Sequence, residues 1–272
     1  MTTGIRLLAI DLDDTLLRDD NTVSAYTKDI LKAAQAEGIE VLIATGRMYQ
    51  TAEPVGKALG IGDVPMVLYS GGLVQYIESG RKLYEKAIPL ATARKVLAMA
   101  KERGWYIQAY VDDVLYVHHE TEFSKSYEKA TGATAVYIGD ALYDLDGEPN
   151  KLLIIEEPAV IDTISRTLHE AMDSELAIVR SKRHFLELNP PQTSKGEALH
   201  FMAQRLGVPV EAMVAFGNSE NDISMLKEAG HAIAVANAEE MVKAVADEVC
   251  RSNEDDGVAH WVATHVLGRN EA

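Results

Sequence analysis

Two aspartates separated by one residue, Asp11 and Asp13, have the types and spacing that phosphoryl transfer requires. A carboxylate can attack phosphorus and form an acyl phosphate, and a second carboxylate two positions along the chain can protonate the leaving oxygen and later activate water. We therefore predict that Asp11 is a nucleophile and that Asp13 is the general acid and base of such a reaction.

Three further segments contain groups that bind phosphate or a hard cation. They are Thr45-Gly46-Arg47, Lys195-Gly196 and the stretch from Gly217 to Asp222. A lysine, a hydroxyl group and backbone amides at a helix start suit a phosphate group, whereas clustered carboxylates and other oxygen donors suit Mg²⁺. Together with the two aspartates, these segments predict one site for phosphoryl transfer.

Hydrophobic patterns place these segments at the ends of strands or at the starts of helices. Apolar runs directly precede Asp11, Thr45 and Gly217, and each run predicts a buried strand. The predicted strands cover residues 5–10, 39–44, 65–69, 212–216 and 232–235, and the predicted helices cover residues 24–37, 49–59, 195–206 and 222–229. Alternating strands and helices predict an α/β fold with a parallel sheet, whose sites lie at the carboxyl ends of the strands.

The pattern changes in the middle of the chain. Strands are expected near residues 106–118 and 151–155, and helices are expected near residues 91–103 and 160–172. These elements indicate a second sheet that interrupts the first. We predict a core domain formed by residues 1–84 and 188–272, with an inserted α+β domain over residues 85–187.

The composition excludes several classes of protein. The 272 residues include 26 Lys and Arg against 42 Asp and Glu, a formal net charge of −16, so the chain lacks the basic surface that nucleic-acid binding requires. No apolar run approaches the roughly 18 residues of a membrane span, and no signal-peptide pattern opens the sequence. The single cysteine, Cys250, agrees with a reducing compartment. We expect a cytoplasmic protein that acts on a small phosphorylated molecule, with neither nucleic acid nor membrane as partner and with its oligomeric state left open.

The four segments resemble, in order and spacing, the motifs of the haloacid dehalogenase superfamily, specifically its Cof-type type-IIB phosphatases. Asp11-Leu12-Asp13-Asp14-Thr15 is similar to the first motif, Thr45-Gly46 to the second, Lys195 to the third, residues 217–222 to the fourth, and residues 253–259 to a C-terminal signature. The resemblance covers essentially the whole chain. It implies a Rossmann-like parallel-sheet core with an inserted α+β (type IIB) cap that acts as a lid.

The resemblance also implies roles for individual residues. Asp11 would be nucleophile and Mg²⁺ ligand, and Asp13 would be the acid and base and would give its backbone carbonyl to the metal. The phosphate-binding residues would be Leu12 through its amide, Thr45, Gly46, Lys195 and Asn221, and the metal ligands would be Asp11, Asp13, Asn218 and Asp222. The implied activity is Mg²⁺-dependent hydrolysis of a small phosphorylated metabolite, a sugar phosphate or a phosphorylated cofactor, through an aspartyl phosphate.

The sequence departs from the family pattern at three places. Asn218 stands where the family has an aspartate that ligates Mg²⁺, and the amide removes one negative charge, so the affinity for Mg²⁺ should fall unless Asp222 and Glu220 compensate. Asp14 replaces a commoner glycine. Ser70-Gly71 stands where Asn-Gly is commoner.

Several alternatives stay open. Asn218 is compatible with a ligand-binding or regulatory protein that keeps the fold and has lost turnover, and a phosphomutase would be distinguished by an isomerised product. A signalling receiver domain also combines aspartates, threonine and lysine, but it is shorter and has its phosphorylated aspartate on a middle strand.

Five polar residues have simpler interpretations or no assigned role. Thr45 and Asp222 could be helix-capping residues, and Arg47 has no assigned role. The adjacent His118 and His119 would point to opposite faces of a strand, which disfavours a metal site there.

Overall fold

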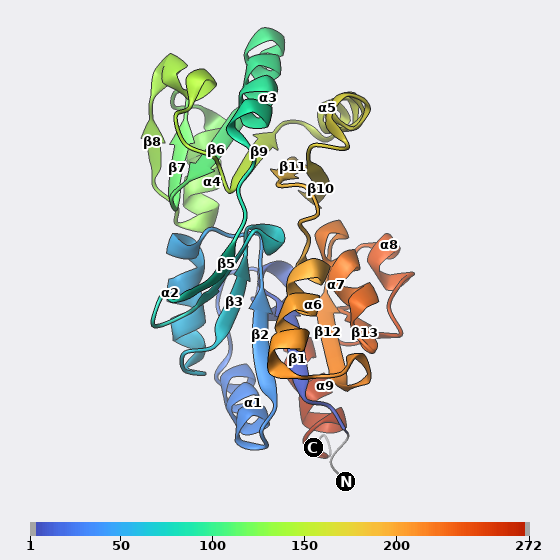
Figure 1. Ribbon diagram of the computed structural model, residues 1–272. Coiled ribbons are helices and arrows are strands. Elements are labelled where there is room, and N and C mark those ends of the chain that lie inside the picture. The colour runs from blue at the N-terminus through green and yellow to red at the C-terminus, as the bar shows by residue number, and fades with distance from the viewer. Residues whose placement is uncertain (1–3, 270–272) are drawn as a thin grey trace.

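The computed structural model describes residues 4–269, and within them one sheet has eight strands (Figure 1). Its spatial order is β14 (Glu248–Val249), β13 (His231–Ala234), β12 (Met213–Gly217), β1 (Leu7–Asp11), β2 (Glu40–Ala44), β3 (Pro65–Leu68), β4 (Leu73–Tyr76) and β5 (Lys82–Glu85). The strands from β14 to β3 are parallel, whereas β4 and β5 are antiparallel additions. The central strand β1 is buried along its whole length, as expected for a strand covered on both faces.

Helices follow the strands of this sheet and bury its faces. They are α1 (Ala25–Ala36), α2 (Tyr49–Leu59), α6 (Lys195–Leu206), α7 (Ile223–Glu228), α8 (Glu240–Lys243) and α9 (Gly257–His265). Local signals fix several of their ends: the Ser24 and Ser194 side chains accept N-cap hydrogen bonds from Thr27 and Glu197, and left-handed Gly60 and Gly207 end α2 and α6. The predicted helices 49–59 and 195–206 therefore have their predicted bounds.

A second sheet of six strands lies over the carboxyl ends of the parallel strands (Figure 1). Its order is β10 (Ala177–Lys182), β11 (Phe185–Asn189), β9 (Lys151–Ile155), β6 (Ile107–Val111), β7 (Val114–Val117) and β8 (Ala135–Tyr137), and its helices are α3 (Leu90–Arg103), α4 (Glu122–Thr131) and α5 (Pro158–Met172). All neighbours are antiparallel except β7 and β8.

Strand β9 shows how the second sheet has two apolar faces. Leu152 and Ile154 belong to a hydrophobic cluster with residues of α3 and α5, whereas Leu153 and Ile155 belong to the cluster that includes the larger sheet. Successive residues of a strand point to opposite faces, so an uninterrupted apolar run buries both faces. One face of the second sheet is thus directed toward the carboxyl ends of the parallel strands.

The chain changes sheets twice. It leaves the larger sheet after β5, which ends at Glu85, and returns to it after β11, which ends at Asn189. Strand β11 thus ends two residues beyond residue 187, the predicted end of the inserted domain. The division into a core domain and an inserted domain stays a prediction. Over the described part of the chain, no helix has the length and apolar character needed to cross a bilayer.

Candidate active site

Asp11 is the last residue of β1, and a short helical turn, Leu12–Leu16, follows it directly. Strand pairing with β2 and β12 places this carboxylate at the centre of the sheet's carboxyl edge. Within the turn Asp14 has φ 59°, a left-handed conformation that glycine adopts without strain. This backbone conformation accounts for the commoner glycine at the position, and the Asp14 carboxylate pairs with Lys182 Nζ at 3.2 Å.

Lys195 joins the ends of two strands. It is 1% exposed in the first turn of α6, and its Nζ donates hydrogen bonds of 2.6 Å to Asp11 Oδ1 and of 2.6 Å to Asp222 Oδ1. The other carboxylate oxygen of Asp222 accepts hydrogen bonds from the amides of Asn218 at 2.9 Å and Ser219 at 3.0 Å. Asp222 therefore holds both the lysine and the loop after β12.

This buried group is electrostatically coupled. Burial and then the charge of Asp222 raise the pKa of Asp11 to about 7, although Lys195 opposes the change. Burial by itself would lower the pKa of Lys195, but the carboxylates of Asp11 and Asp222 outweigh that effect and raise it. The lysine thus stays positively charged and can offset negative charge beside Asp11.

Arg47 holds the second aspartate. Its Nη2 lies 2.6 Å from Asp13 Oδ1 and its Nε lies 3.0 Å from Asp13 Oδ2, a bidentate pair, and Nη2 also donates to Asn21 Oδ1 at 2.9 Å. Burial would raise the pKa of Asp13, but the hydrogen bonds and charge of Arg47 lower it below its usual value. Arg47 was not predicted as a site residue from the sequence; its position directly after Thr45-Gly46, at the end of the strand beside β1, was the available signal.

Thr45 and Gly46 pack where the two sheets meet. Thr45 is fully buried, and its hydroxyl accepts a hydrogen bond from the Arg47 amide at 3.1 Å; the helix-cap interpretation is wrong, because α2 has Met48 at its N-cap. At Gly46 an added Cβ would lie 2.9 Å from Glu187 Oε1 and 3.1 Å from Ser70 Oγ, so a larger residue would displace the Glu187 side chain.

Ser70 and Lys151 link the sheets around Gly46. The Ser70 hydroxyl donates to Glu187 Oε2 at 2.6 Å, and Lys151 Nζ donates to the Gly46 carbonyl at 2.6 Å. Ser70 itself has φ 53°, a left-handed conformation that asparagine tolerates well and that accounts for the commoner Asn-Gly. Residues far apart in sequence therefore join β11 and β9 to the loops of the larger sheet.

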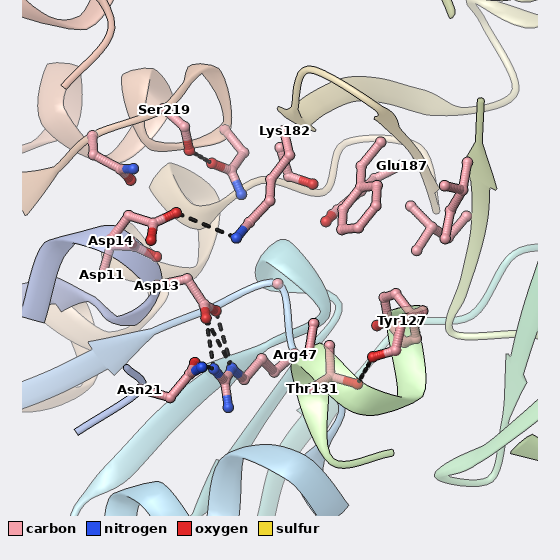
Figure 2. Close-up of a pocket in the computed structure, with 18 of the residues that line it drawn as sticks. Asp11, Asp13, Asp14, Asn21, Arg47, Tyr127, Thr131, Lys182, Glu187 and Ser219 are labelled. Carbon is pink, nitrogen blue, oxygen red and sulfur yellow. Dashed lines mark hydrogen bonds and ion pairs between the residues drawn. The ribbon is translucent and has the colours of Figure 1, made fainter. Parts of the chain in front are cut away.

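A pocket of about 420 Å³ lies between the two sheets beside these groups. Figure 2 shows Asp11, Asp13 and Asp14 on one side of it and Tyr127 and Glu187, from the second sheet and its helix, on another. Five predicted site residues line it: Asp11, Asp13, Gly46, Asn218 and Asn221. The other four, Leu12, Thr45, Lys195 and Asp222, are almost fully buried and do not line it.

Comparison with known protein families agrees with this geometry. The profile of the haloacid dehalogenase-like hydrolase family matches residues 8–262. The chain belongs to this family. The resemblance drawn from the four motifs is confirmed, and so is the predicted fold class of a Rossmann-like core with an inserted cap.

Relatives of this haloacid dehalogenase-like hydrolase match along its length. The phosphatase YwpJ of Bacillus subtilis (strain 168) is 29% identical, covering 97% of this chain and 100% of its own. The 5-amino-6-(5-phospho-D-ribitylamino)uracil phosphatase YitU of the same organism is 28% identical, covering 96% and 98%. The crystal structure of TM0651 from Thermotoga maritima superimposes with a TM-score of 0.81 at 31% identity, covering 98% of each chain. BT4131, described as a subclass IIB sugar phosphatase, shares the fold with a TM-score of 0.81 at 22% identity, covering 97% of this chain and 99% of its own.

The oxygen donors of this hydrolase suit a hard cation. Asp11, Asp13 and Asn218 line the same pocket. Arg47 pairs with the Asp13 carboxylate, so the donors toward a cation would be the Asp11 carboxylate, the Asp13 backbone carbonyl and the Asn218 amide oxygen. The Asn218 Oδ1 accepts a hydrogen bond of 3.2 Å from the Thr15 hydroxyl, which orients it. This donor set fits Mg²⁺, with less negative charge than three carboxylates would provide. Within residues 4–269, no group of three or more His, Cys, Asp and Glu side chains is arranged to bind a metal.

The two adjacent histidines lie outside the pocket. The prediction that they point to opposite faces of a strand is wrong, because β7 ends at Val117 and both residues follow it. The Nδ1 atoms of His118 and His119 lie 2.5 Å apart, and His118 Nε2 contacts Asp140 at 2.8 Å.

Proposed function

We propose that this protein is a Mg²⁺-dependent phosphoric monoester hydrolase that acts on a small phosphorylated metabolite through an aspartyl phosphate on Asp11. The observation that carries the proposal is the buried Lys195, which bonds the Asp11 carboxylate at the base of a pocket that Asp13 also lines. Sugar phosphates and phosphorylated cofactors are the candidate substrates. The relatives named as phosphatases support the same reaction class.

In the first step the Asp11 carboxylate attacks phosphorus, and the bond between phosphorus and the ester oxygen breaks. The ester oxygen takes a proton from Asp13 and leaves as an alcohol. In the second step a water molecule gives its proton to Asp13 and attacks the same phosphorus, which frees the Asp11 carboxylate and inorganic phosphate. The positive charge of Lys195 offsets negative charge beside Asp11 in both steps.

We propose that Mg²⁺ binds to the Asp11 carboxylate, the Asp13 backbone carbonyl and the Asn218 amide oxygen. Asp222 would orient Lys195 and the Asn218 loop, because both of its carboxylate oxygens already accept hydrogen bonds from these groups. When bound, Mg²⁺ would neutralise and orient the transferring phosphoryl group. The Leu12 amide, Thr45, Gly46 and Asn221 would bind the phosphate oxygens.

We further propose that residues 85–187 form a cap that closes over the bound substrate. The contacts of Glu187 with Ser70 and of Lys151 with Gly46 support this role, because they join the second sheet to the loops after β3 and β2. A closed cap would exclude bulk water and strengthen the electrostatic interactions around Asp11.

Asn218 favours a second candidate, a ligand-binding or regulatory protein without turnover. The amide removes one negative charge from the expected metal ligands, and weaker Mg²⁺ binding would leave substrate binding without efficient hydrolysis. The two candidates differ in one measurable way: a weakened enzyme gains activity when the carboxylate is restored, and a protein that has lost catalysis does not.

The test is release of inorganic phosphate from a panel of sugar and cofactor phosphates, with Mg²⁺ and with EDTA. The parent protein, Asp11→Asn and Asn218→Asp are purified and assayed side by side. Metal-dependent release that Asp11→Asn abolishes supports the hydrolase. Release by Asn218→Asp alone identifies a weakened enzyme, and no release by either protein supports the ligand-binding candidate.

A further inference from the structure

We propose that the leaving group of the substrate contains a planar ring with few hydroxyl groups, which packs against an apolar wall on the cap side of the pocket. The wall consists of Phe123, Tyr127, Leu153, Ile155 and Phe185. This inference deepens the proposed function and rests on it, because it names the class of phosphate ester.

The wall is formed by helix α4 and by strands β9 and β11 of the second sheet. Phe123 and Tyr127 are four residues apart on α4 and so lie on one face of that helix. Leu153 and Ile155 project from the face of β9 that is directed toward the larger sheet. Phe185 begins β11 and contacts Tyr127, with ring centroids 5.9 Å apart. The three elements thus place aromatic and aliphatic side chains on the same pocket.

Two of these rings retain surface for a ligand. Phe123 and Phe185 are half-buried, whereas Leu153 and Ile155 are buried. Partly exposed aromatic side chains in a concave site gain favourable free energy when a flat apolar group covers them. The pocket volume of about 420 Å³ accommodates a phosphate group together with a ring system.

The charged groups on the cap side of the pocket are already paired. Lys151 donates to the Gly46 carbonyl, Glu187 accepts from Ser70, and Lys182 pairs with Asp14. A sugar buries several hydroxyl groups, and each needs a hydrogen-bond partner to offset its loss of water. Ser126, Tyr127, Thr131 and Ser181 also bring hydroxyl groups to this side of the pocket, and the Thr131 hydroxyl already donates to the Tyr127 carbonyl. These groups can bond the polar substituents of a ring, whereas the apolar wall matches its flat face.

The test compares two esters of similar size. Pyridoxine 5′-phosphate and glucose 6-phosphate both carry a phosphorylated CH₂ group on a six-membered ring, but only the first ring is planar and aromatic; the alcohol form also avoids reaction of an aldehyde with lysines. We expect kcat/KM for pyridoxine 5′-phosphate to exceed that for glucose 6-phosphate by about tenfold or more. Equal values, or a preference for glucose 6-phosphate, would overturn the proposal.

Substitutions in the wall test whether it causes this preference. Phe123→Ser and Phe185→Ser should reduce the ratio of the two kcat/KM values toward one, mainly through a higher KM for pyridoxine 5′-phosphate, and Phe185→Leu should keep part of it. The matched control is Phe201→Ser. Phe201 is also half-buried but packs edge-on against Tyr84, with ring centroids 4.8 Å apart, outside the pocket. A ratio that the wall variants leave unchanged contradicts the proposal.

Two further measurements separate this inference from the proposed function. Hydrolysis of acetyl phosphate, which has no ring, tests the hydrolase alone. Binding of pyridoxine 5′-phosphate and glucose 6-phosphate to Asp11→Asn, followed by calorimetry, tests the ring preference without turnover. If acetyl phosphate is hydrolysed and the ring ester is not preferred in binding, the inference is wrong and the proposed function stands; preferred binding without any hydrolysis supports the inference and removes the proposed function.

Discussion

Arg47 donates two hydrogen bonds to the Asp13 carboxylate, from Nη2 to Oδ1 at 2.6 Å and from Nε to Oδ2 at 3.0 Å. The pair joins the end of β2 to the turn after β1 and keeps Asp13 ionised by lowering its pKa. An ionised carboxylate is ready to accept a proton from water, whereas donation to a leaving group requires that the carboxylate first gain a proton. In the proposed reaction Arg47 would thus be a positioning residue that sets the protonation of Asp13.

Replacing Arg47 should therefore move the pH profile. In Arg47→Gln the Asp13 pKa loses the lowering effect of the guanidinium, so the limb of the kcat profile that depends on ionised Asp13 should shift upward by roughly one pH unit or more. Steady-state phosphate release between pH 4.5 and 9 measures this. Arg18→Gln is the control, because Arg18 lines the same pocket but pairs with Asp256. An unshifted profile in Arg47→Gln would exclude the proposed coupling.

Removal of Lys195 should cost stability as well as activity. Lys195→Met leaves Asp11 and Asp222 buried without their cation, and the loss of one partner of a buried ion pair lowers the free energy of unfolding by about 3 kcal/mol or more. Urea denaturation at pH 7.5 measures this loss, and phosphate release should fall to background. The double variant Lys195→Met, Asp222→Asn should recover part of the stability and none of the activity; equal stability of the single variant and the parent would refute the assignment.

Restoring a carboxylate at position 218 should tighten Mg²⁺ binding. Asn218→Asp adds a negative charge among the oxygen donors of the pocket, and we expect the Kd for Mg²⁺ to fall roughly tenfold. Isothermal titration calorimetry measures the Kd without turnover. Asn237→Asp adds the same charge at an exposed position whose side chain bonds the Asp14 carbonyl. If both variants tighten binding equally, general electrostatics explains the effect and Asn218 is not a ligand.

The metal-free protein should lose stability as the pH rises toward 7. The pKa of Asp11 is 3.8 ordinarily and about 7 in the folded protein, so between these values the folded state binds more protons than the unfolded state. The contribution of Asp11 to the free energy of unfolding is therefore present below pH 4 and is lost as the pH rises to about 7. Chemical denaturation in EDTA at pH 5, 6, 7 and 8 measures the slope, which Asp11→Asn should flatten. A slope that is the same in both proteins would show that Asp11 does not titrate there.

Asp113 should control the contact between the β6–β7 turn and α2. Its carboxylate accepts hydrogen bonds of 2.9 Å from the Gln50 amide and of 2.9 Å from the Tyr69 hydroxyl. Asp113→Ala should weaken this contact by about 1 kcal/mol and speed hydrogen exchange of the Gln50 amide roughly fivefold. Asp112→Ala is the control, because Asp112 shares the left-handed backbone conformation, with φ 50° beside 61° for Asp113. If the Gln50 amide exchanges at the same rate in both variants, Asp113 does not hold the contact with α2.

Much of the core could be predicted because its signals are local. The apolar residues of β1 and the acidic residues after it, the serine N-cap of α6 and its terminal glycine, and the repeated change from strand to helix are all readable within a few residues. Strand ends of a parallel sheet meet at one edge, so these local signals also brought Asp11, Lys195 and Asn218 to one site.

Elements of the second sheet were harder to place. Helix α4 (Glu122–Thr131) and strands β10 and β11 were not predicted individually, although Thr121 is the N-cap of α4 and its side chain forms a capping box with Ser124. Its apolar side chains are few, and Phe123, Tyr127 and Ala130 line the pocket, so the segment has a low apolar content although these residues share one face. The apolar wall depends on Phe123 and Phe185, which are distant in sequence.

The sequence by itself therefore determined the order of the core elements, the edge at which the reactive groups gather and the identity of the nucleophile as a prediction. Only the tertiary structure decided that Arg47 pairs with Asp13, that Ser70 meets Glu187, and that the cap presents an apolar wall. The physical reason is how far apart in the sequence the interacting residues lie. Helix ends and strand burial follow from neighbouring residues, whereas a contact between residues 117 positions apart exists only after two sheets have packed together.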